Sequence, residues 1–321
     1  MELKYDRQEF AYNVLKERFD ANESMWLSEQ LVAYEEQIYK IEYEGYLYKE
    51  LSPVVSDGEG LQSVGYFQRN KSGKAKILSS AADDLPNLNA KMTKQTLPVY
   101  HYGACYGWDY WTLKEAQRLA MPLESDMAMD ARDAMELLLD DGFFDGITSH
   151  DVPGLFTNAN NYPEVTIAAG GLLSKTPEEL VEIFGELIDN VYDTTQRRHR
   201  ANVCLLPVHV ESHFKRAILS GSAMSVMNFL RANYPEVRFV GTSKVKGRTF
   251  TLASGTFTNK NFICAYKVDP MVLKYKVPVP FLQHPLERRK MLFARDVTGD
   301  IAGVEIKNFS AFAIGAADLD P

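Results

Sequence analysis

Apolar residues recur every three or four positions in several parts of the chain, and each such stripe predicts one buried face of a helix. Within residues 1–45 the recurring positions are Leu27, Leu31, Tyr34, Ile38 and Ile41. A weaker stripe in a more charged background precedes them. We therefore expect an amphipathic helix after an amino-terminal arm that orders against a neighbour, with a helix packed on its own domain as the alternative.

A longer helical pattern spans residues 111–141. Pro122 interrupts it, because proline lacks a backbone N–H donor and clashes with the preceding turn. Beyond this interruption, small and flexible side chains are expected on one face, where they would pack closely against a sheet: Met127, Ala131, Ala134, Met135 and Leu138.

A third helix has an explicit start signal. Thr176 stands as the N-cap, Pro177 follows at the first helical position, and Glu179 lies three residues after the cap, which together form a capping box. The predicted buried stripe of this helix consists of Leu180, Phe184, Leu187, Ile188 and Val191.

Extended segments precede the long helix. Runs through Tyr66–Phe67 and Ile77–Leu78 flank the polar segment Asn70–Gly73, and two such runs around a glycine-containing loop predict a β-hairpin. Few of its residues are strongly apolar, so we expect the hairpin to project from the body of the molecule. Residues 90–110 then follow as one long strand.

The second half of the chain alternates between strands and helices, which is typical of a compact α/β lobe. A short buried strand is predicted at Val203–Pro207, two helical pieces are separated near Gly221, and strands return around 237–240 and 262–268. Residues 290–316 indicate two strands that turn at Thr298–Asp300.

Composition narrows the possible functions. The chain has 321 residues, 45% of them hydrophobic, and a formal net charge of -8, which argues against a protein that mainly wraps phosphate backbones. Cys105, Cys204 and Cys264 are too few and too widely spaced for a disulfide framework, and they suit a reducing cytoplasm. No secretory signal and no run of about 18 apolar residues is present, so no membrane partner is expected.

Catalytic motifs are weak throughout. His209, Glu211 and His213 form the one cluster of metal-ligand types, but a zincin requires the order His-Glu-x-x-His. A metal-dependent hydrolase built on these three residues stays an alternative from a different functional class. Ser149-His150-Asp151 is interpreted as turn chemistry, because adjacency in sequence does not define a triad. We expect no cofactor and no metal.

The order of several segments, rather than any single motif, resembles the major capsid proteins of tailed phages with the Hong Kong 97 fold. The segments are the projecting hairpin, the break at Ala82–Pro86, the aromatic strand from Pro98 to Trp108, the long helix, the turn at Gly154–Asn158 and the strand Leu205–Pro207. The resemblance extends over nearly the whole chain. Pro122 departs from the family pattern.

The resemblance implies an α+β fold with a defined division of the chain. An amino-terminal arm and helix would occupy residues 1–50, an extended hairpin loop 51–80, a peripheral lobe with a spine helix 81–164, an axial lobe 165–285, and returning strands 286–321. The arm is too short to include a fused scaffolding segment.

The function implied is structural and not enzymatic. Copies would assemble as hexamers and pentamers into an icosahedral shell around double-stranded phage DNA, which they touch weakly, with portal and scaffolding or decoration proteins as further partners. Assembly would take place in the bacterial cytoplasm. The runner-up is an encapsulin-type shell that encloses a cargo enzyme.

Candidate contacts between subunits come from the arm, the hairpin and one charged run. They are Trp26, Tyr66, Phe67, Arg69, Lys71, Lys74, Arg197, Arg198 and Arg200. Opposite charges at such positions set the register between subunits while adding little affinity. A solvated loop is the simpler interpretation of the three arginines.

Overall fold

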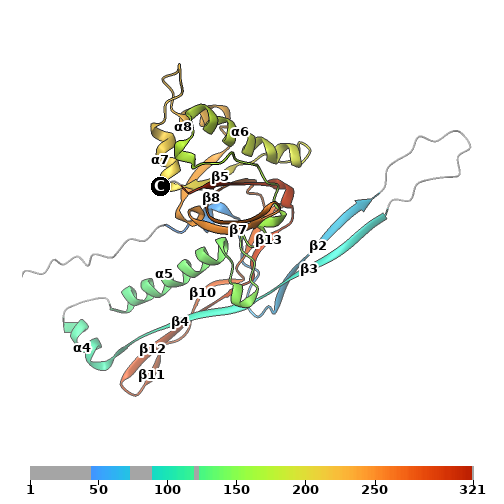
Figure 1. Ribbon diagram of the computed structural model, residues 1–321. Coiled ribbons are helices and arrows are strands. Elements are labelled where there is room, and N and C mark those ends of the chain that lie inside the picture. Colours follow the sequence, from blue (N-terminus) through green and yellow to red (C-terminus); the bar gives the residue numbers. More distant parts are fainter. Residues whose placement is uncertain (1–44, 73–88, 119–122, 320–321) are drawn as a thin grey trace, which may run out of the picture. The chain divides into compact units, whose positions relative to one another are not determined.

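The computed structural model describes residues 45–72, 89–118 and 123–319 (Figure 1). The chain divides into two units, Met1–Gly45 and Tyr46–Pro321, and everything below concerns the second. The predictions that involve the amino-terminal stripes, Trp26, Lys74 and Pro122 therefore lie outside the described residues.

A five-stranded sheet forms the centre of the carboxy-terminal half. Its strands are β5 (Val203–Pro207), β6 (Arg238–Thr242), β7 (Arg248–Leu252), β8 (Gly255–Tyr266) and β14 (Phe312–Asp318). The long strand β8 pairs with β14, β5 and β7, and β5 continues the sheet to β6 in parallel. The strands predicted in this region are confirmed.

Both faces of this sheet are buried, and strand alternation decides which side chain goes where. Val203 and Leu205 enter one hydrophobic cluster, while Cys204 and Leu206 enter the other. The second cluster lies beneath α6 (Pro177–Thr194), α7 (Val208–Arg216) and α8 (Val226–Asn233), which Figure 1 shows on the same side of the sheet.

Helix α6 confirms the capping box. The Thr176 hydroxyl accepts a hydrogen bond from the Glu179 backbone N–H at 3.3 Å, and the Glu179 carboxylate accepts one from the Thr176 N–H at 2.8 Å. The stripe predicted to be buried is buried: Leu180, Phe184, Leu187, Ile188 and Val191.

A second sheet is organised around β4 (Tyr100–Asp109) and β12 (Leu292–Ile301), which pair antiparallel over ten residues. The other edge of β12 pairs with β10 (Val279–Gln283) and β11 (Glu287–Arg289). Helix α4 (Tyr110–Arg118) follows β4, and α5 (Leu123–Phe144) packs on this sheet through Ala131 and Met135. The predicted spine helix is therefore present.

The predicted face of α5 is partly wrong. Ala131 and Met135 are buried, but Ala134 and Leu138 are exposed, and Leu139 is buried in place of Leu138. Residues 131, 135 and 139 follow one another at steps of four, so they lie on one line of the helix, whereas 134 and 138 are rotated away from it.

The predicted turn at Thr298–Asp300 is wrong, because these residues lie inside β12. Strand β12 ends at Ile301, and the next strand, β13 (Gly303–Ile306), begins at Gly303, which has a positive φ of 96°. Gly299 has a packing role instead: a Cβ atom there would collide with the ring of Tyr102 on the neighbouring strand. Gly299 is therefore needed for close packing against the neighbouring strand, although its sequence context suggested a turn.

A small third sheet contains β1 (Val54–Val55), β9 (Leu273–Lys276) and β13 (Gly303–Ile306). Its buried face joins the core of the central sheet and contacts α3 (Tyr48–Leu51). The Tyr275 hydroxyl donates to the backbone oxygen of Leu139 at 2.7 Å, which ties this sheet to α5.

The predicted hairpin exists, but its pairing is different. Strand β2 (Ser63–Ser72) pairs antiparallel with β3 (Asn89–Pro98) over ten residues. Asn70, Lys71 and Ser72 are strand residues, so the turn predicted at Asn70–Gly73 is wrong, and Ile77–Leu78 lies outside the described residues. The strand expected over 90–110 is consequently divided, with β3 in the hairpin and β4 in the second sheet.

None of the helices described here is both long enough and apolar enough to cross a membrane.

Candidate functional site

The β2–β3 hairpin has two different faces. Phe67 is opposite Lys94, and Tyr66 is opposite Gln95, so strand alternation places Phe67 and Tyr66 on opposite sides. Met92 lies two residues from Lys94 and therefore shares the side of Phe67. Phe67 and Met92 are each 66% exposed.

The Tyr66 side contacts its own chain. The Tyr66 hydroxyl donates to the backbone oxygen of Ile306 at 3.4 Å, and the Lys307 ammonium lies 5.8 Å from the ring centroid. Burial, with the Glu305 carboxylate nearby, raises the pKa of Tyr66. The base of the hairpin is thus held by β13, whereas the Phe67 side has no such support among the described residues.

A two-stranded ladder of this kind is marginally stable in water when it has no third strand or packed surface. Within the described ranges, β2 and β3 form a sheet of two strands. The arrangement suits a segment whose Phe67 side becomes covered by another molecule. Arg69 and Lys71 lie in β2, and the sequence of the two strands contains four basic residues and no acidic residue.

A second exposed apolar patch lies at the junction of β4, α4 and the β11–β12 turn. We call Trp111, Met291 and Leu292 the apolar tip; they are 67%, 49% and 45% exposed. The backbone N–H of Tyr110 donates to the Met291 oxygen at 2.8 Å, and Leu292 is opposite Asp109, so the three residues meet at one end of the sheet.

Sequence analysis missed the apolar tip. The available signal was composition: tryptophan and methionine next to Arg288, Arg289 and Lys290, since Trp, Met and Arg are enriched at protein interfaces. Nothing in the sequence showed that β12 would bring Met291 beside Trp111.

Arg197, Arg198 and Arg200 lie in an exposed turn after α6. Thr195 orders this turn, because its hydroxyl donates to the Val191 oxygen at 2.7 Å and accepts from the His199 N–H at 3.1 Å. The Arg200 guanidinium lies 4.8 Å from the centroid of the Tyr192 ring. The structure therefore places the three arginines at the surface.

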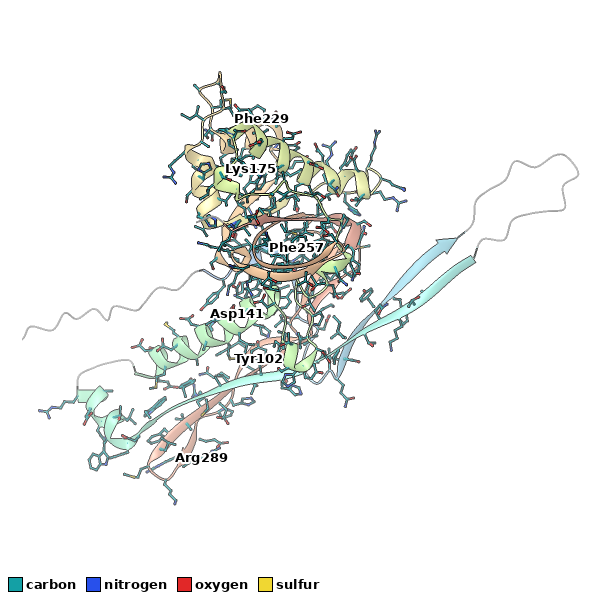
Figure 2. The ribbon with its side chains drawn as sticks, viewed as in Figure 1. Tyr102, Asp141, Lys175, Phe229, Phe257 and Arg289 are labelled. Atoms are coloured by element: carbon teal, nitrogen blue, oxygen red, sulfur yellow. The ribbon has the colours of Figure 1, made fainter. Side chains whose placement is uncertain are left out.

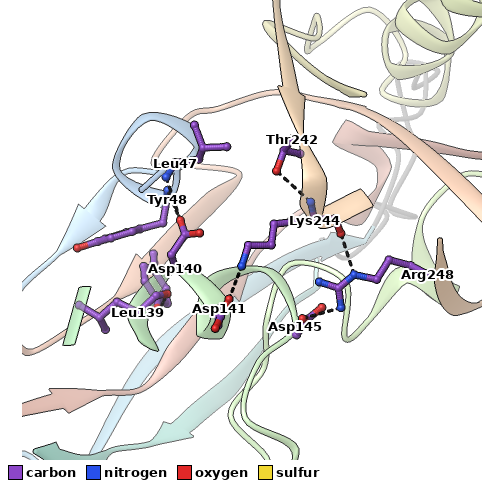
Figure 3. A network of polar contacts seen from close by, with 10 residues as sticks. Leu47, Tyr48, Leu139, Asp140, Asp141, Asp145, Thr242, Lys244 and Arg248 are labelled. Atoms are coloured by element: carbon purple, nitrogen blue, oxygen red, sulfur yellow. Dashed lines mark hydrogen bonds and ion pairs between the residues drawn. The ribbon is translucent and has the colours of Figure 1, made fainter. Parts of the chain in front are cut away.

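Acidic residues near the carboxyl end of α5 join three parts of the chain (Figure 3). Asp140 accepts hydrogen bonds from the backbone N–H groups of Leu47 at 2.9 Å and Tyr48 at 3.1 Å. Asp141 pairs with Lys244, and Asp145 pairs with Arg248 at 2.7 Å. Because negative charge is unfavourable at a helix carboxyl end, these two cations stabilise the end of α5 while linking it to the central sheet.

Burial is the main cause of the raised pKa values at this junction. It raises the pKa of Asp140, while the two backbone donors and Lys244 oppose the shift. Tyr48, which donates to Glu136 at 2.5 Å, also has its pKa raised by burial and by that hydrogen bond. These contacts therefore hold Leu47 and Tyr48 against α5.

Two of the candidate metal ligands on α7, His209 and Glu211, have different partners. Glu211 pairs with Lys215 at 2.7 Å, while the Nε2 atom of His209 lies 3.4 Å from the Asn261 amide nitrogen. Among the described residues, no group of three or more His, Cys, Asp or Glu side chains is placed to hold a metal ion. The geometry gives no support to the hydrolase alternative.

Ser149-His150-Asp151 forms a turn, as interpreted from the sequence. The Ser149 hydroxyl lies 2.7 Å from Nδ1 of the adjacent His150, and Asp151 has a left-handed backbone with a φ of 54°.

The exposed Cys105 and the buried Cys204 and Cys264 are free thiols. Figure 2 draws side chains on the ribbon and labels Tyr102, which lies in β4 of the second sheet, and Arg289, the last residue of β11.

Comparisons with known proteins agree on one family. A family model described as "Major capsid protein" matches residues 73–315. The structure is similar to the capsid protein of Myoviridae phage XM1, with a TM-score of 0.74 and 19% identity, covering 90% of this chain and 97% of that chain.

Two further solved structures have the same fold. The protein of Mycobacterium phage Ogopogo gives a TM-score of 0.61 at 14% identity, covering 90% of this chain and 98% of its own. The capsid of a native GTA particle gives 0.67 at 12% identity, covering 90% and 96%. No curated protein matches the chain.

Proposed function

The chain belongs to the major capsid protein family, and we propose that its copies assemble into a closed icosahedral shell around double-stranded phage DNA. The α+β fold and the resemblance stated from the sequence are confirmed by the family match and by the phage capsid structures. The role is that of a structural subunit in a virion capsid.

The observation that carries the assembly proposal is the Phe67 side of the β2–β3 hairpin, which no described residue supports. Two large apolar side chains, Phe67 and Met92, are 66% exposed on a ladder that is too small to be stable alone. A neighbouring copy that covers this side would bury both residues, and each is worth about 1.5–3 kcal/mol when fully removed from water. Phe67 is therefore our leading contact residue, with Arg69, Lys71 and Lys74 beside it in sequence.

The division into lobes is also a proposal. Residues 165–285, with α6, α7, α8 and much of the central sheet, would form the axial lobe. Residues 81–164 with the returning strands 286–321 would form the peripheral lobe, supported by the pairing of β4 with β12. Residues 1–50 would form the arm, and the hairpin loop of 51–80 would extend through its partner strand β3.

The partners follow from this role. We propose hexamers and pentamers of the chain as building units, assembled in the bacterial cytoplasm with portal and scaffolding or decoration proteins. Contact with DNA would be weak, since a chain of net charge -8 repels phosphate except at local basic sites. Arg197, Arg198 and Arg200 are the proposed site of such contact.

Shortening the hairpin tests the assembly proposal. Residues 68–93 are replaced by Asn-Gly, a two-residue turn that joins the opposed pair Phe67 and Lys94. The shortened protein is expected to keep a cooperative melt near the wild-type temperature, because the hairpin contributes little to the core. It should form no closed shells in electron microscopy.

The wild-type chain, expressed alongside, is the control. Closed shells from the shortened protein would show that the hairpin is dispensable, and loss of cooperative melting would show that it belongs to the core. The contents of wild-type shells separate the two shell functions: packaged DNA in particles purified from a phage-producing host supports the capsid, and an enclosed enzyme without DNA supports the encapsulin alternative.

A further inference from the structure

Three cations adjoin the apolar tip in sequence, while the exposed Asp109 is opposite Leu292. Arg288, Arg289 and Lys290 immediately precede Met291, and Glu287 engages Arg289 at 3.0 Å. The Arg288 guanidinium lies 5.5 Å from the centroid of the Phe293 ring. The tip thus combines exposed tryptophan, methionine and leucine with an excess of cations, which is the composition of an interface centre rather than of a solvated turn.

The turn that presents Met291 is also conformationally costly. Lys290 has a left-handed backbone with a φ of 60°, a region that side chains other than Gly, Asn and Asp rarely adopt. A tight turn that only connects two strands would favour glycine or asparagine at this position. Met291 and Leu292 follow this residue directly, and both are exposed.

The outer face of α5 has the complementary character. Met129, Asp133 and Leu137 follow at steps of four on one line of the helix, with Asp126 beside them. Met129 and Leu137 are 57% and 44% exposed. The helix therefore presents apolar side chains beside carboxylates, with the exposed Arg132 also close to Met129 in sequence, whereas the tip presents apolar side chains beside cations.

A single chain cannot bring these two surfaces together. The side of α5 that packs on the β4–β12 sheet contains Ala131 and Met135. Met129, Asp133 and Leu137 are offset from this line by two residues, or about 200° around the helix, so they lie on the side opposite the sheet. On that side the Tyr46 hydroxyl of the same chain donates to the Asp133 backbone oxygen at 3.0 Å, while the Met129 and Leu137 side chains stay exposed. The tip is part of that same sheet, so it cannot reach the outer face of its own α5.

We propose that the apolar tip of one copy docks on the outer face of α5 of a second copy. This contact rests on the proposed shell function and names one of its interfaces. It is heterologous, because two different surfaces meet, so each copy offers one tip and one helix face and the contact can repeat from subunit to subunit. The charges align the two surfaces, and the apolar side chains supply the affinity.

Disulfide trapping tests the contact directly. In a Cys105→Ser background, Met129→Cys and Met291→Cys are introduced separately and together, and assembled shells are oxidised and run on a non-reducing gel. The chain with both changes should give a ladder of cross-linked species, since the contact repeats, whereas neither single variant should cross-link. Mass spectrometry should identify the 129–291 linkage.

A matched control replaces Met291→Cys with Met271→Cys, another methionine, which is 73% exposed. No ladder is expected from its combination with Met129→Cys. Cross-linking by Met291→Cys alone would mean that tips meet tips, and shells without a 129–291 linkage would mean that the tip docks elsewhere; either result overturns the proposal.

Charge reversal gives a second measurement. Arg289→Glu with Lys290→Glu should lower the yield of shells about tenfold, because like charges would then face each other. Adding Asp126→Lys and Asp133→Lys should restore the yield, while Arg231→Glu with Lys246→Glu, at exposed sites elsewhere, should not lower it. Failure of the added lysines to restore assembly in a folded protein overturns the docking. If the chain that has only the Cys105→Ser substitution forms no oligomers at all, the shell function itself is contradicted.

Discussion

The central five-stranded sheet and the β2–β3 hairpin are built by the same pairing rules, but their apolar side chains have opposite surroundings. Every residue of β5 is buried, because one face packs beneath α6, α7 and α8 and the other joins the largest core. On the hairpin, Phe67 and Met92 are mostly exposed. Hydrogen bonding between strands therefore does not by itself show that their apolar side chains are buried within the same chain.

The difference teaches how to separate stability from assembly in this chain. Apolar side chains in the central sheet lose contact with water when one chain folds, so they stabilise the monomer. Those on the hairpin and the apolar tip are exposed to water among the described residues, so we expect their contribution to belong to association. Substitutions of the same kind in the two regions should consequently separate folding from shell formation.

The largest expected effect compares one substitution in the two regions. Phe184→Ala in α6 removes a fully buried ring that lies 4.8 Å from the Phe214 ring, and should lower the free energy of unfolding by about 3–5 kcal/mol. Phe67→Ala should change it by less than about 0.5 kcal/mol, as expected for an exposed site. Chemical denaturation of both variants measures this.

Assembly should show the reverse order. Phe67→Ala is expected to be fully folded and to form few or no shells. If Phe67→Ala costs as much stability as Phe184→Ala, the hairpin is part of the monomer core and the distinction between the two regions is lost.

A smaller effect is expected from the start of α6. Thr176→Ala removes the side-chain acceptor of the capping box and should cost about 1 kcal/mol of unfolding free energy without changing shell formation. Glu182→Ala, on the exposed side of the same helix, serves as the control. An assembly defect in Thr176→Ala at unchanged stability would place this end of α6 in an interface.

The smallest effect concerns Asp140, which fixes the segment that leads into the hairpin. Its pKa is raised in the folded state, so the folded protein retains this proton at a pH where the unfolded chain releases it. The contribution to stability is present below the unfolded value and is lost as the pH rises through the folded value. Asp140→Asn keeps an oxygen acceptor for Leu47 and Tyr48 but cannot ionise.

The unfolding free energy of wild type relative to Asp140→Asn should therefore fall as the pH rises from about 4, the ordinary value of an aspartate. Denaturant titrations at several pH values measure this difference, and Asp133→Asn controls for the loss of a carboxylate from α5. A difference that stays constant with pH would show that Asp140 ionises as easily in the folded protein as in the unfolded chain.

Local signals predicted several elements well. The capping box at Thr176, the stripe on α6 and the buried run at Val203–Pro207 are each encoded by residues close in sequence, and each is present as expected. A long helix after the aromatic strand was predicted for the same reason. The resemblance to phage capsid proteins depended on the order of such segments, which is why it was correct although no motif was specific.

The choice of which strands pair with each other was not encoded by residues close in sequence. The sequence showed an extended run at Tyr66, but only the folded chain decides that β2 pairs with β3. Gly299 had the composition of a turn and turned out to make room for the Tyr102 ring on β4.

The apolar tip and the outer face of α5 show the same limit for the candidate interfaces. Helical periodicity established that α5 has a buried side, but the contacts with β4 and β12 decided that Leu139 faces inward and that Leu138 does not. Likewise, Trp111 and Met291 are far apart in sequence and meet because β4 pairs with β12. Periodicity and capping depend on neighbours within a few residues, so the sequence determined the elements; the exposed surfaces depend on contacts between distant segments, which tertiary structure alone decided.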